Sequence, residues 1–128
     1  GDKLVFTGNS ATTSAIHTIA QHATTITAGT AVKGMAIDAS GVITFYSLGS
    51  GGTVVAPASG NIAEIWAILA GEASATTSAG SVGEFVYGND TYVVHFDGAS
   101  HNDVVKLVGV SDTTGLSATA AATKVFFG

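Results

Sequence analysis

Apolar residues alternate with other positions most clearly in the second half of the chain. Tyr92, Val94 and Phe96 occupy every second position, which is the period of a β-strand with one face in the core. Residues 85–87 continue the pattern on the other side of Gly88–Asn89–Asp90, a sequence typical of tight turns. The pattern therefore predicts two strands joined by a short turn.

Other segments carry the same signature. Residues 32–37 and 42–46 are separated by Asp38–Ala39–Ser40–Gly41, where Asp can accept hydrogen bonds from the backbone ahead and Gly can take a positive φ. This spacing predicts a hairpin. Further expected strands are residues 3–7, 24–27, 103–110 and 124–127, which brings the total to seven or eight.

One segment has helical rather than strand periodicity. Asn61 precedes it, Glu64 follows three residues later as in a capping box, and Gly71 is the expected end. Its apolar residues on one face are Ile62, Ile65, Trp66 and Leu69. Residues 47–60 are turn-forming throughout, and residues 11–21 fit either a weak helix or a loop.

These elements predict a mainly β fold, a sandwich or roll of about seven or eight strands with one covering α-helix. The length of 128 residues fits a single domain over 1–128. No apolar run is long enough for a transmembrane helix, since the longest, 62–70, is short and contains Glu64.

Charge is scarce, at 10% of residues against the roughly 25% usual in globular proteins, so the surface must consist largely of Thr, Ser, Gly and Asn. The net charge is -5 and the four cations, all lysines, are dispersed. Nucleic acid is thus a poor partner. Without cysteine the chain has neither disulfides nor a thiolate metal site.

Signatures of catalysis are missing from the sequence. It has no phosphate-binding loop with a following Lys-Ser/Thr and no G-x-S-x-G nucleophile elbow. The four histidines lack a zinc spacing, and alternation predicts that His95 points to solvent, opposite Val94 and Phe96. We therefore expect a protein that is not an enzyme.

Hard oxygen donors cluster between two predicted strands. Asp97, Asn102 and Asp103 lie within one expected loop, and such oxygens in a tight loop suit Ca²⁺. The spacing is not that of an EF-hand, and a pair of Asx turns joining the strands is the alternative. Asp90, in the preceding turn, is a further candidate ligand.

The stretches NDTYVVHFDG (89–98) and NDVVKLVGV (102–110) resemble the C-terminal regions of type I-secreted RTX and bacterial surface-layer (S-layer) proteins. The opening GDKLVFTG is similar to the strand that follows the calcium-binding repeats in those regions. The resemblance implies an extracellular, cell-surface β-structure, calcium-linked folding after export, C-terminal secretion information and self-association. The nonapeptide G-G-x-G-x-D repeats of that family are absent from this sequence.

The first functional hypothesis is a structural, self-assembling domain of a surface-layer-like protein, with itself as partner and Ca²⁺ bridging at the loop of Asp97, Asn102 and Asp103. One alternative is an adhesin or carbohydrate-binding module for cell-surface polysaccharide. Its exposed aromatic platform would come from Trp66, Tyr46, Tyr87 or Tyr92. The other alternative is a trimeric appendage or phage-fibre domain, which would close at three chains.

Overall fold

The computed structural model describes residues 3–5, 18–23, 31–73, 80–96, 102–111, 115–118 and 124–127. These residues form one helix and nine strands in three antiparallel sheets of three. One sheet has the order β1 (Lys3–Val5), β9 (Lys124–Phe127) and β8 (Leu116–Ala118). The second contains β2 (Ile19–Ala23), β3 (Gly34–Ile37) and β4 (Ile43–Tyr46). The third contains β5 (Val82–Tyr87), β6 (Asp90–Phe96) and β7 (Asn102–Leu107).

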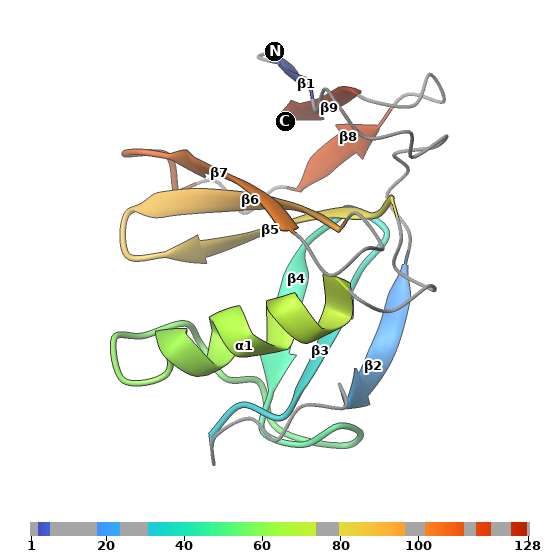
Figure 1. Ribbon diagram of the computed structural model, residues 1–128, viewed down its shortest axis with the longest axis vertical. Coiled ribbons are helices and arrows are strands. Elements are labelled where there is room, and N and C mark those ends of the chain that lie inside the picture. Colours follow the sequence, from blue (N-terminus) through green and yellow to red (C-terminus); the bar gives the residue numbers. More distant parts are fainter. Residues whose placement is uncertain are drawn as a thin grey trace.

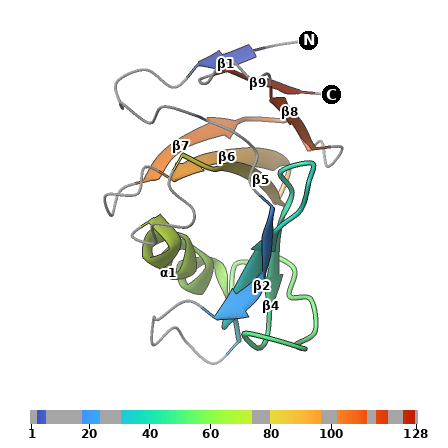
Figure 2. The same ribbon diagram turned by 90° about the vertical axis from the view of Figure 1, so that its right-hand side faces the viewer.

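The sheets are layered, and the β5–β6–β7 sheet lies in the middle (Figures 1 and 2). The β1–β9–β8 sheet covers one of its faces, while α1 (Ile62–Ala73) and the β2–β3–β4 sheet lie on the other. The mainly β, sandwich-like fold with one helix is therefore confirmed. The strand count exceeds the prediction because residues 19–23 and 116–118 also form strands. The expected strand 24–27 lies outside the described residues.

The main core fills the space between α1, the middle sheet and the β2–β3–β4 sheet. Phe45 of β4 meets Phe85 of β5 edge-on, with ring centroids 5.4 Å apart. Ile65 and Leu69 of α1 are fully buried in the same cluster. The apolar spacing along α1 thus produces a helix that packs on two sheets at once.

Both predicted hairpins form with the expected turn chemistry. The carboxylate of Asp38 accepts the N–H groups of Ser40 and Val42, and Gly41 has a φ of 79°. In the other hairpin Tyr87 pairs with Asp90, so that Gly88, with a φ of 64°, and Asn89 form the turn. Turn residues with local hydrogen bonds and positive φ were sufficient to locate both.

The helix differs from the prediction at both ends. Gly71 does not terminate it, because α1 continues to Ala73. At the start, the side-chain oxygen of Asn61 accepts the N–H of Ala58 in the preceding turn. Glu64 accepts the N–H of Val32, thereby tying the first turn of α1 to the residues before β3. α1 is the one helix in the described part of the chain, and it is too short to cross a membrane.

His95 is buried, with 3% of its surface exposed, so the prediction that it points to solvent was wrong. His95 does point to the face of β6 opposite Val94, as predicted, but both faces of β6 are covered. The β1–β9–β8 sheet lies over the face that carries His95 and Val93 (Figure 2). A strand that lies between two layers has buried side chains on both of its faces.

Candidate functional site

The predicted calcium ligands occupy different environments. Asp97 lies outside the described residues. Asn102 and Asp103 are the first two residues of β7 rather than part of a loop. Because neighbouring residues of a strand point to opposite faces, their side chains diverge. The structure therefore does not bring these two groups together as sequence proximity suggested.

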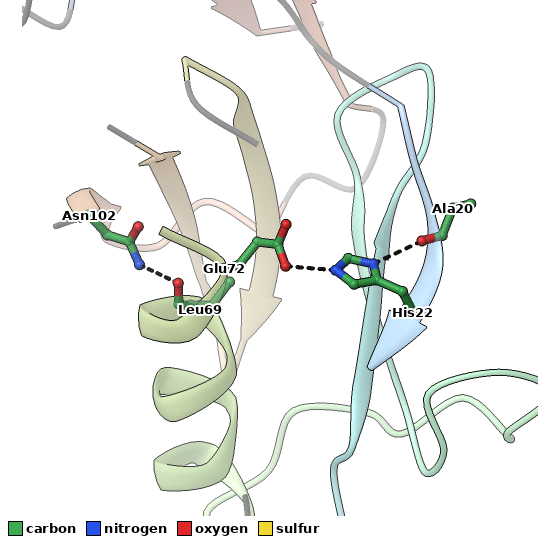
Figure 3. Close-up of polar contacts among 5 residues, drawn as sticks. All are labelled: Ala20, His22, Leu69, Glu72 and Asn102. Atoms are coloured by element: carbon green, nitrogen blue, oxygen red, sulfur yellow. Dashed lines mark hydrogen bonds and ion pairs between the residues drawn. The ribbon is translucent and has the colours of Figure 1, made fainter. Parts of the chain in front are cut away.

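Asn102 joins β7 to α1. Its side-chain nitrogen donates to the carbonyl oxygen of Leu69 at 2.8 Å (Figure 3). Its side-chain oxygen is buried and, among the described residues, has no hydrogen-bond partner. The side-chain amide thus donates a hydrogen bond to a helix carbonyl and holds the start of β7 beside the last turns of the helix.

Asp103 faces the opposite side of the sheet, toward His95. Its Oδ2 lies 3.3 Å from Nδ1 of His95, its cross-strand neighbour in the register of β6 and β7. The histidine is buried whereas the carboxylate is more than half exposed. The contact therefore joins a buried imidazole, beneath the β1–β9–β8 sheet, to a carboxylate at the solvent-exposed edge.

Asp90 lies at the opposite end of the hairpin, about 20 Å along β6 from the residues that pair with the start of β7. Its carboxylate accepts the N–H of Gly109 at 2.8 Å and forms an ion pair with Lys106 at 2.9 Å. The hydrogen bond from Gly109, and then that from Lys106, holds the pKa of Asp90 below its ordinary value. Asp90 therefore fastens the end of β7 rather than sharing an ion with Asn102 or Asp103.

This arrangement predicts an acid-sensitive contribution to stability. The pKa of Asp90 is lowered by folding, so its contribution is present above the ordinary Asp pKa of about 4 and is lost as pH falls through the lower folded value. Urea unfolding across a pH series should show wild type more stable than Asp90→Asn at pH 6, with the difference disappearing at low pH. A difference that is constant over the series would contradict this assignment.

In the described part of the chain, no three acidic or histidine side chains come close enough to hold a metal ion together. Calcium binding by Asp97, Asn102 and Asp103 accordingly stays a prediction of the sequence.

No pattern in the sequence indicates the contact between His22 and Glu72. Nε2 of His22 in β2 lies 2.8 Å from Oε2 of Glu72, a residue of α1 that is 1% exposed (Figure 3). The other ring nitrogen, Nδ1, lies 3.0 Å from the carbonyl oxygen of Ala20, which can only accept, so Nδ1 carries a proton. The pair links the second sheet to the end of the helix, across 50 positions of sequence.

The aromatic side chains mostly contact one another. The ring of Tyr92 stacks on Phe85 with centroids 5.4 Å apart, while the ammonium group of Lys106 lies 5.7 Å from its centroid. Phe85 and Lys106 belong to the strands on either side of Tyr92, so both ring faces are in use. Trp66 meets Tyr92 edge-on. Tyr92 therefore offers no free face for stacking on a sugar.

Large apolar side chains are exposed on β7 and just after it. Val104 on β7 is 43% exposed, and Val108 just after it is 77% exposed.

Comparison of the chain with known protein families, with curated proteins and with solved structures found no match.

Proposed function

We propose that this chain is a structural domain of an extracellular, surface-layer-like protein and that copies associate through the outer edge of β7. The observation that carries the proposal is this edge. β7 pairs with β6 on one side, and no described strand pairs with it on the other. An open strand edge presents unpaired N–H and C=O groups to another strand.

The open edge of β7 is only partly protected against pairing. Charged residues on edge strands normally discourage pairing, and β7 contains Asp103 and Lys106. Both contact their own sheet, since Asp103 lies against His95 and Lys106 is paired with Asp90. The exposed apolar side chains that remain are Val104 and, just beyond the strand, Val108 and Val110.

A second copy of β7 fits this edge in antiparallel orientation. A two-fold axis perpendicular to the sheet joins the two copies into one continuous sheet. Residues that pair across the axis must then belong to the same face of that sheet, so both have even numbers or both have odd numbers. Centring the axis on Val104 places the two Val104 side chains together and sets Lys106 opposite Asn102 of the other copy. No like charges meet in this register.

Replacing Val104 with lysine tests the proposal. Two lysines would then lie directly opposite each other at the axis, which is destabilising, so we expect self-association to weaken about tenfold or more, equivalent to at least about 1.4 kcal/mol. Analytical ultracentrifugation over a concentration series measures this. Ala39→Lys, at an exposed turn position, is the matched control and should associate like wild type.

Each alternative has a distinct outcome. Wild-type protein that stays monomeric at all concentrations would rule out edge association, and a discrete trimer would support a fibre domain instead. Repeating the series with Ca²⁺ and with a chelator tests the calcium part alone. Particles of equal size in both would reject calcium bridging and leave the edge contact intact.

A further inference from the structure

The outer face of the β2–β3–β4 sheet contains a second apolar surface. Ala36 pairs with Thr44 and Gly34 with Tyr46, while a single bridge joins Tyr46 to Val54. Paired residues share a face, so these side chains lie together, opposite the buried Phe45 and Met35. We name this surface the Tyr46 face; its residues are Ala36, Thr44, Tyr46, Leu48 and Val54.

The loop after β4 extends this surface. Gly34 has no side chain, and the backbone of Leu48 and Gly49 lies directly over it. Hydrogen bonds between Ser47 and Thr53 close the loop. Leu48 is left 50% exposed and Val54 66% exposed, although both are large apolar residues.

The Tyr46 face lies on the side of the β2–β3–β4 sheet opposite α1, the same side as the loop that follows β4 (Figure 2). Figure 2 shows α1 on one side of the β2–β3–β4 sheet and no described helix or other sheet on the opposite side. The outward face of such a sheet is ordinarily polar. Here no charged residue occurs anywhere from 39 to 63, and the face has Tyr46 at its centre.

We propose that the Tyr46 face is a second self-association surface, occupied by the same face of another copy. Depletion of charge around a central aromatic residue is the composition of interface cores between proteins. A neutral surface meets its own copy without repulsion or buried unpaired charge, whereas the remaining surface of the chain is net acidic. A polysaccharide would need more hydrogen-bonding groups than the hydroxyls of Thr44 and Tyr46 provide.

This inference rests on the proposed contact through β7 and changes its outcome. One two-fold contact between identical surfaces closes at two chains. Two different two-fold contacts on the same chain close only when their axes intersect, as in a tetramer with D2 symmetry; otherwise every copy added through one surface still offers the other. The β7 edge and the Tyr46 face together would therefore build an extended row if the two axes do not intersect, and a closed oligomer of at least four chains if they do. A row is the minimum requirement for a surface lattice.

Lysine substitutions separate the two contacts. Wild type should form assemblies of more than two chains, either rows of growing length or a closed oligomer, in ultracentrifugation and electron microscopy. Val54→Lys should stop at dimers joined through β7, Val104→Lys should stop at dimers joined through the Tyr46 face, and the double variant should be monomeric. Circular dichroism checks that each variant is folded, and Ala39→Lys should still assemble like wild type.

Cysteine crosslinking gives an independent readout, because the chain has no cysteine of its own. Val54→Cys should form a covalent dimer with a short bis-maleimide linker about tenfold faster than Ala39→Cys, since contact raises the effective concentration. If Val54→Lys assembles like wild type and the two cysteine variants crosslink equally, the Tyr46 face is not an interface. An effect of Val104→Lys would in that case still support the β7 edge.

Discussion

Replacing Gly34 with alanine is expected to destabilise the protein by about 3 kcal/mol, because a methyl group has no room at this position. A Cβ there would overlap the carbonyl oxygen of Leu48 and lie 3.0 Å from that of His22. Both are backbone atoms that cannot rotate away. For a chain of this size, such a loss lowers the melting temperature by roughly 10 °C, which differential scanning calorimetry measures directly.

Gly60→Ala is the matched control, since a Cβ at Gly60 meets nothing within 4 Å. It should leave stability unchanged or raise it by about 0.5 kcal/mol through a less flexible unfolded chain. Equal stability of the two variants would show that the loop does not pack on Gly34. The arrangement of Leu48 on the Tyr46 face would then have to be abandoned as well.

Local interactions explain what the sequence could predict. The hairpin around Asp38 depends on hydrogen bonds within four residues and on the positive φ of Gly41. The helix follows from the spacing of Ile65 and Leu69, both of which are buried. In each case the interactions that decide the structure lie within a few positions of one another.

Contacts between distant segments explain what the sequence could not predict. His95 is buried because another sheet, formed by the two ends of the chain, lies over its face of β6. Gly71 lies inside the helix although glycine usually favours an end. Within the candidate site, Asn102 and Asp103 diverge because β7 begins one residue earlier than the pattern indicated.

Removing the contact between His22 and Glu72 is expected to cause the second large loss of stability. Breaking a fully buried ion pair by removing one partner costs about 3–5 kcal/mol. Because His22 is 37% exposed, solvent reduces the loss, and we expect His22→Ala to cost about 2 kcal/mol. The loss arises because the side-chain carboxyl group of Glu72, which is buried at 1% exposure, loses its contact with the imidazole. Urea unfolding at neutral pH measures it.

A double-mutant cycle separates this interaction from simple loss of packing. Glu72 has further interactions besides the one with His22, so Glu72→Ala alone should also be destabilising. If the two side chains stabilise each other, the double variant should lose about 1–2 kcal/mol less than the sum of the single losses. Gln21→Ala, in the same strand, serves as the control and should show no coupling to Glu72→Ala. Strict additivity of His22→Ala and Glu72→Ala would mean that β2 is held to the helix by packing alone.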